Sequence, residues 1–174
     1  MACRPIISCT AGRGAGRWLM PACLVLVLAG CQQSPPREAS TLVMQQRVAF
    51  PGMAPDHAAA DEGCDVTRRL ADDIQYYARP HFSRIAVADT VSAKTPGKAL
   101  YVEVLDFSGG GRKIAVEGML WDNGVEVGSF IAQDTAWRST SGCMALTSVS
   151  RVLGKRIAHW LAAPTRNARL GPLR

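Results

Sequence analysis

The side chains best suited to covalent chemistry in this 174-residue chain are its six cysteines. Three of them precede residue 30 and share one N-terminal segment: Cys3, Cys9 and Cys23. Cys31 follows that segment directly, and Cys64 and Cys143 lie far along the chain. Thiols can be alkylated, can join as disulfides or can bind metals, so the surroundings of each cysteine decide which reaction applies.

Residues 1–30 have the organisation of an export signal. The first 17 residues include basic residues and no acid, and an apolar stretch from Leu19 to Leu28 follows. This stretch is shorter than the roughly 20 residues that a bilayer span needs. It ends in Leu28-Ala29-Gly30-Cys31, which resembles the lipobox of bacterial lipoproteins. The resemblance implies that residues 1–30 are removed as a signal peptide and that the Cys31 thiol receives a diacylglyceryl group.

Two alternatives to lipidation stay open: an ordinary signal peptide cut nearby, and an uncleaved membrane anchor. Two or more acyl chains, such as palmitate, anchor a protein stably, whereas one binds only marginally. In enterobacterial lipoproteins an Asp after the modified cysteine favours inner-membrane retention, and Gln32 stands there in this chain. The resemblance therefore implies an anchor in the outer membrane on the periplasmic side, with inner-membrane retention as the alternative.

Cys64 and Cys143 are the two cysteines left after processing. An even remainder in an oxidising compartment favours a disulfide, with two buried free thiols as the alternative. The disulfide would close a loop of about 80 residues, for which chain entropy predicts at most about 4–5 kcal/mol. We expect no metal site and no cofactor, because the three histidines show no ligand spacing: His57, His81 and His159.

Carboxylates offer the only catalytic candidates in the sequence. Asp89 and Asp106 each end an expected strand, and two carboxylates at one sheet edge can act as acid and base. They are the basis of the alternative function, a hydrolase of envelope material. Aspartates at strand ends more often make turns, and no serine has a nucleophile-elbow sequence. We therefore predict no enzyme.

The elements that must position these residues follow from hydrophobic periodicity. Apolar side chains repeat at helical spacing from Cys64 to Ala78 and again from Met144 to Leu161. Strands are expected over 82–89, 100–105 and the two arms of a hairpin within 112–137. The expected organisation is a Pro-rich tether over 31–60, with a possible edge strand at 42–50, a small domain over 61–163, and a basic tail over 164–174.

Asn123-Gly124 is the preferred pair for a two-residue type I′ hairpin turn, because both central residues need a positive φ. The turn alone predicts a register in which paired residue numbers sum to 247. Leu120 then faces Val127, and Lys113 faces Asp134 as a favourable charge pair.

The predicted fold is α+β, an antiparallel sheet of about four strands with two helices packed on one face. Parallel helices would bring Cys64 and Cys143 together. With the lipobox and tether, this pattern weakly resembles small α/β periplasmic lipoproteins, such as the activators of penicillin-binding proteins and the curli-secretion lipoprotein. No motif of those families is matched, so no site residue is carried over.

The same register gathers apolar residues on the sheet face away from the helices: Tyr101, Leu105, Met119, Trp121 and Phe130. An exposed apolar group with a charged rim is typical of a partner surface, but residues 42–50 or the C-terminal tail would make it a second core if they covered it. We therefore predict a lipid-anchored binding or assembly module, with an envelope protein or glycan as partner. The net charge of +6 falls to about +3 without the signal peptide, too weak an excess to predict nucleic-acid binding.

Overall fold

A computed structural model describes residues 40–51, 61, 63–108, 112–136 and 142–171. They all belong to one compact unit, Ser34–Arg174. The export signal and Cys31 lie outside the described residues, so lipidation stays a prediction.

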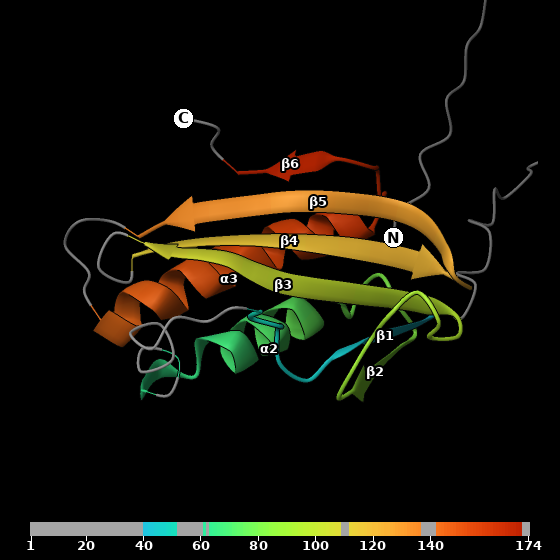
Figure 1. The fold of residues 1–174 in the computed structure, drawn as a ribbon, viewed down its shortest axis with the longest axis horizontal. Coiled ribbons are helices and arrows are strands. Elements are labelled where there is room, and N and C mark those ends of the chain that lie inside the picture. The colour runs from blue at the N-terminus through green and yellow to red at the C-terminus, as the bar shows by residue number, and fades with distance from the viewer. Residues whose placement is uncertain (1–39, 52–60, 62, 109–111, 137–141, 172–174) are drawn as a thin grey trace, which may run out of the picture. The chain divides into compact units, whose positions relative to one another are not determined.

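The unit is built on one six-stranded mixed sheet (Figure 1). Its strands are β1 (Thr41–Gln45), β2 (Arg84–Ala88), β3 (Lys98–Ser108), β4 (Lys113–Asp122), β5 (Val125–Thr135) and β6 (Ala168–Leu170), in the order β2-β1-β3-β4-β5-β6. The three central strands β3, β4 and β5 are antiparallel. Strand β1 is parallel to both β2 and β3, and β6 is parallel to β5.

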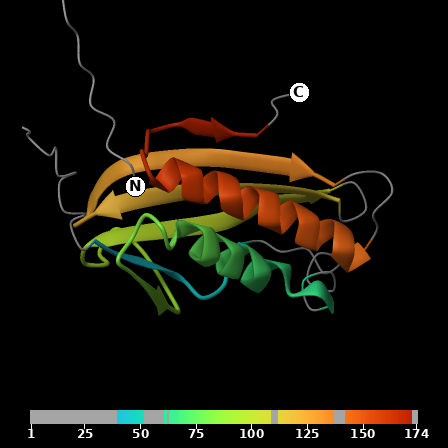
Figure 2. The same cartoon turned by 180° about the vertical axis from the view of Figure 1, so that it is seen from behind.

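Two helices, α2 (Val66–Ala78) and α3 (Gly142–Leu161), cover one face of this sheet (Figure 2). They lie side by side and run in the same direction, as predicted (Figures 1 and 2). Their apolar stripes are buried, with Leu70 and Ile74 on α2 and Leu153 and Ile157 on α3 all fully inaccessible. The α+β class and the two-helix layer are therefore confirmed.

Cys64 and Cys143 meet beside the first turns of the two helices, where the structure joins them by a disulfide. Their Cα atoms are 5.2 Å apart, within the range that a disulfide spans. The disulfide therefore fastens α2 to α3 at the end where both helices begin.

The prediction of about four antiparallel strands is wrong, because two segments outside 61–163 join the sheet. Strand β1 comes from the expected tether and is an internal strand, with Leu42 and Met44 buried. Strand β6 comes from the expected basic tail and pairs with β5. Both additions are parallel, since the chain reaches them through a helix or a long connection rather than a tight turn.

The 123–124 turn forms as predicted, with φ of 50° at Asn123 and 86° at Gly124. The predicted register holds only for the two pairs nearest the turn. A β-bulge at Val127 then shifts it by one residue, so Leu120 faces Gly128. Lys113 consequently faces Thr135 rather than Asp134, and its ammonium lies 3.5 Å from the Asp106 carboxylate instead.

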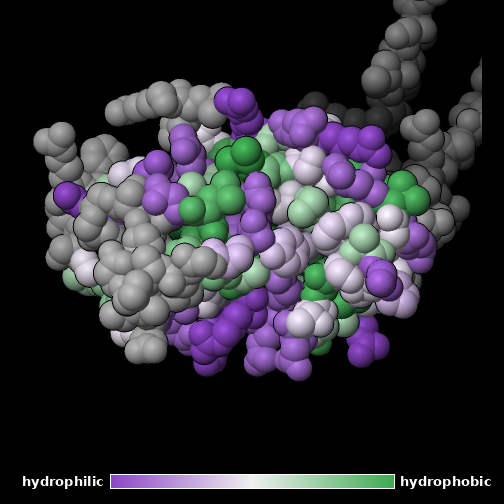
Figure 3. Space-filling view, viewed as in Figure 1, coloured by the Kyte–Doolittle hydropathy of each residue, from purple (hydrophilic) through white to green (hydrophobic). Residues whose placement is uncertain are grey.

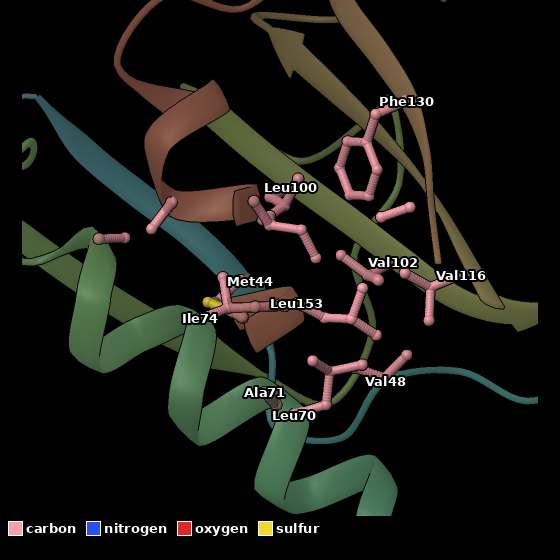
Figure 4. Close-up of a cluster of buried hydrophobic side chains, with 14 of the residues drawn as sticks. Met44, Val48, Leu70, Ala71, Ile74, Leu100, Val102, Val116, Phe130 and Leu153 are labelled. Atoms are coloured by element: carbon pink, nitrogen blue, oxygen red, sulfur yellow. The ribbon is translucent and has the colours of Figure 1, made fainter. Parts of the chain in front are cut away.

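The core lies between the sheet and the helices (Figure 4). Figure 4 shows Leu100, Val102 and Val116 of the sheet beside Leu70 and Leu153 of the helices. Alternate residues of each strand supply this face, and the residues between them point to the opposite face.

Candidate functional site

The candidate site is the face of the sheet opposite the helices, which we call the outer face. No helix of the described residues packs on it (Figures 1 and 2). Tyr101, Met119 and Trp121 are half-buried there, whereas Leu105 and Ile131 are 45% and 49% exposed. Figure 3 shows hydrophobic groups on this side of the molecule with hydrophilic residues among and around them. The arrangement is that of an apolar surface with a polar rim.

Four of the five residues predicted for this surface lie on it. Tyr101 and Trp121 are close, with ring centroids 6.4 Å apart. Leu105 stands at a second β-bulge, between Val104 and Asp106, which leaves it exposed.

Phe130 was predicted for the outer face, and that prediction is wrong. It is 2% exposed and packs against Trp160 of α3, with ring centroids 4.8 Å apart. The bulge at Val127 moves Phe130 to the helix side, and Gly118 makes room there, because a Cβ at that position would collide with the Phe130 ring. Ile131, one residue later, takes the place on the outer face.

The described residues of the two expected covering segments do not lie over this face. The described part of 42–50 forms β1 and a further bridge beside β3, between Ala49 and Glu103. The described part of the C-terminal segment forms β6 at the edge of the sheet. Both segments extend the sheet sideways instead of stacking on it.

A row of side chains crosses the outer face from strand to strand. Glu103 on β3 faces Glu117 on β4, Glu117 faces Ile131 on β5, and Ile131 faces Arg169 on β6. Two glutamates directly opposite each other repel when both are charged, which costs stability. Sequence reasoning missed this row, because the pairing of Glu103 with Glu117 depends on the register between β3 and β4.

The hydrogen bonds of the row offset part of that repulsion. The Tyr101 hydroxyl donates a hydrogen bond of 2.5 Å to Oε2 of Glu103. Burial, with the Glu103 hydrogen bond and the nearby negative charges, raises the pKa of Tyr101 to about 12. The pKa of Glu117 is also raised, mainly by a hydrogen bond with Glu103 and further by burial and by the negative charge of Glu103. The hydroxyl and carboxyl groups at the centre of the outer face can therefore both donate and accept hydrogen bonds.

A shallow hollow of about 500 Å³ lies beside this row. Its polar lining comes from three strands and from the turn before β6: Glu117, Glu126, Ser129, Asn167 and Arg169. Met119 and Ile131 add apolar surface. The carboxylates of Glu117 and Glu126, an arginine and aliphatic side chains in one hollow suit a partner group with both polar and apolar parts.

The structure separates the two candidate catalytic aspartates. In the sheet register, Ala88 of β2 pairs with Gln45 of β1, and Met44 of β1 pairs with Leu100 of β3. Asp89, the next residue after Ala88, is therefore in register with residue 101 or 102 of β3. Asp106 is then four or five residues further along, about 15 Å at the rise of a strand. Asp89 is exposed, and Asp106 pairs with Lys113. The carboxylates share no site, and the hydrolase alternative loses its basis.

The described residues hold no group of three or more side chains that could bind a metal ion. Among the same residues, none of the helices has the length and apolar character of a membrane span.

Comparisons with known proteins give distant likenesses to solved structures. No family model matches the chain, and no curated protein matches it. One similar solved structure is PelC, a dodecamer from Paraburkholderia phytofirmans, with 17% identity, a TM-score of 0.41, and coverage of 70% of this chain and 88% of that chain. Another is protein XCC0632 of the DUF330 family from Xanthomonas campestris, with 13% identity, a TM-score of 0.43, and coverage of 75% and 85%. At these scores neither likeness assigns a function.

Proposed function

We propose that this protein is a lipid-anchored binding module of the bacterial envelope, which holds an envelope protein or glycan on the outer face of its sheet. Leu28-Ala29-Gly30-Cys31 supports the anchor, and the Cys64–Cys143 disulfide fits an oxidising compartment. The anchor places the module at the membrane, and the folded unit supplies the binding surface.

One observation carries the proposal: helices pack on one face of the sheet, and none of the described helices packs on the other (Figures 1 and 2). The helices bury one face, while Tyr101, Met119 and Trp121 stay at the surface of the other. Tyrosine and tryptophan are over-represented among residues that dominate binding energies, because their rings bury large areas at small entropic cost. The glutamate pair beside them adds directional hydrogen bonds, which gives a partner a defined orientation.

Site-specific photo-crosslinking in the native bacterium tests the proposal. A photoreactive residue at Ile131 on the outer face should give a discrete protein or glycan adduct. The same residue at Tyr76, which is 62% exposed on α2, serves as the matched control and should not give that adduct. Adding Trp121→Ala to the variant with the photoreactive residue at Ile131 should reduce the yield of the adduct about 30-fold. This is the loss expected for a residue that contributes about 2 kcal/mol to binding.

Equal yields of one adduct from Ile131 and Tyr76 would contradict the proposal, since they would show no preference for the outer face. An Ile131 adduct that Trp121→Ala leaves unchanged would do the same. A mature chain without acyl mass on Cys31 would contradict the anchor.

A further inference from the structure

The charges of this chain are divided along its length. All 14 acidic residues precede residue 135, and the charged residues of 135–174 are all basic. The basic residues of that segment are Arg138, Arg151, Lys155, Arg156, Arg166, Arg169 and Arg174. Helix α3 lies within this acid-free segment, so none of its own residues can neutralise its cations.

The cations of α3 have two different roles. Arg156 points toward the sheet, where its guanidinium lies 3.5 Å from the Asp134 carboxylate and donates to the Gln133 carbonyl at 3.2 Å. Arg151 and Lys155 are exposed. They stand four residues apart on the side of α3 away from the sheet, so they form one ridge of the helix.

The ridge continues toward the start of α3 with Met144 and Ser148, at the same helical spacing. Met144 is 73% exposed, the most exposed large apolar side chain among the described residues. Arg69 of α2 joins it, because Arg69, Met144 and Arg151 line one hollow of about 390 Å³. We call Arg69, Met144, Ser148, Arg151 and Lys155 the basic ridge.

The acids of α2 do not cancel this charge. The Asp72 carboxylate lies 3.8 Å from the Arg68 guanidinium. Asp73 accepts a hydrogen bond from the buried Ser150 hydroxyl, between the two helices. The Lys155 ammonium lies 5.2 Å from the centre of the Tyr77 ring, an aromatic contact that leaves its charge in place.

We infer that the basic ridge is a second membrane contact, which docks the helix layer on the headgroups of anionic phospholipids. The inference rests on the lipid anchor of the proposed function. Anionic headgroups complement a surface whose cations form no ion pair among the described residues, and an exposed methionine can enter the interface between headgroups and acyl chains. A basic surface beside an acyl anchor is a familiar pair of signals for stable membrane attachment.

The docking gives the proposed binding surface a direction. The stretch from Cys31 to Ser40 can extend over at most about 30 Å, so a lipid on Cys31 keeps the folded unit near the bilayer. The basic ridge lies on the helix layer, and the outer face lies on the opposite side of the sheet (Figures 1 and 2). With the ridge on the membrane, Tyr101 and Trp121 face away from it, toward a partner in the periplasm.

The test uses the mature lipidated protein in vesicles that carry a headgroup-linked fluorescence quencher. A fluorophore is attached to a single added cysteine, either Ser148→Cys on the basic ridge or Ile131→Cys on the outer face. In phosphatidylcholine vesicles containing phosphatidylglycerol, the Ser148→Cys probe should be quenched and the Ile131→Cys probe should not. High salt or phosphatidylcholine alone should abolish the difference, since salt screens charges between exposed groups.

Arg151→Gln combined with Lys155→Gln should lower the ratio of docked to undocked molecules about 25-fold, because each cation near an anionic surface contributes about fivefold. The matched control, Arg84→Gln with Lys94→Gln, removes two exposed cations elsewhere and should leave quenching unchanged.

Equal quenching of the two probes would overturn the docking, and so would quenching that survives Arg151→Gln with Lys155→Gln. A protein that floats with the vesicles but shows no quenching at Ser148→Cys contradicts the docking and leaves the anchor intact. A protein that does not float contradicts the anchor, and the docking inference fails with it.

Discussion

The two faces of the sheet use the same strands for different purposes. On β3, Leu100, Val102 and Val104 are buried under the helices, while Tyr101 and Glu103 alternate with them on the outer face. The inner side chains are held by packing, which leaves little freedom to vary them. The outer side chains are held by one another and by the solvent, so aromatic rings and a carboxylate pair can stand there. A strand can thus carry a core on one side and a binding surface on the other.

The largest expected effect contrasts one aromatic residue from each face. Phe130→Ala should lower the free energy of unfolding by about 3–5 kcal/mol, because it empties a packed site between Gly118 and Trp160. Trp121→Ala on the outer face should cost about 1 kcal/mol or less. Denaturant unfolding of both variants measures the contrast. Similar losses for the two variants would mean that the outer face is a second core.

The disulfide fastens the helix layer that covers the inner face. Replacing both cysteines, Cys64→Ser with Cys143→Ser, should lower the free energy of unfolding by about 2–4 kcal/mol, mainly through the freedom that the unfolded chain regains. Thermal unfolding of the oxidised wild type and the double variant measures this loss. Equal stability of the two would show that packing of α2 on α3 suffices without the bond.

The smallest expected effect belongs to the glutamate pair of the outer face. Glu117 has a raised pKa, so the folded state holds this proton more tightly than the unfolded chain does. Proton binding at Glu117 therefore stabilises the folded state fully at a pH below 4.5, the ordinary pKa of a glutamate. This stabilisation is lost as the pH rises through the raised pKa of the folded state.

The glutamine in Glu117→Gln cannot ionise, so this variant should not lose stability as the pH rises. The variant should gain about 0.2–1 kcal/mol on the wild type between pH 4 and pH 7, the range expected for a cross-strand charge pair. Urea unfolding at several pH values measures the difference. Glu126→Gln is the matched control, since Glu126 faces Trp121 in register and not a second carboxylate. The same gain in both variants would mean that net charge, and not the pair, causes the effect.

The sequence predicts well the features that depend on neighbouring residues. The helical stripes, the 123–124 turn and the alternation of Leu100, Val102 and Val104 all depend on local spacing, and all are present. The pairing of Cys64 with Cys143 follows from counting cysteines and from the parallel helices, and the structure contains it.

The features that sequence reasoning missed depend on contacts between distant segments. Strand β6 has three residues, too few for a periodic signal. A strand was expected near β1 only as a possible edge strand, and its internal place follows from its parallel pairing with both β2 and β3. The bulge at Val127 follows from packing, because it turns Phe130 toward Trp160. Gly118 and Gly128 could have indicated this packing from the sequence. A glycine inside a strand often marks a place where another group packs close to the backbone, and a Cβ at Gly128 would collide with the Trp160 ring.

The most direct test of the proposed role is capture of the native partner by the full-length protein, compared between wild type and Trp121→Ala. Thermal stability is measured on the same two samples. We predict that capture falls about 30-fold while the melting temperature hardly moves, because Trp121 would contribute to binding and little to the core. Capture that is unchanged in a folded Trp121→Ala protein would contradict the claim that the outer face is the binding surface.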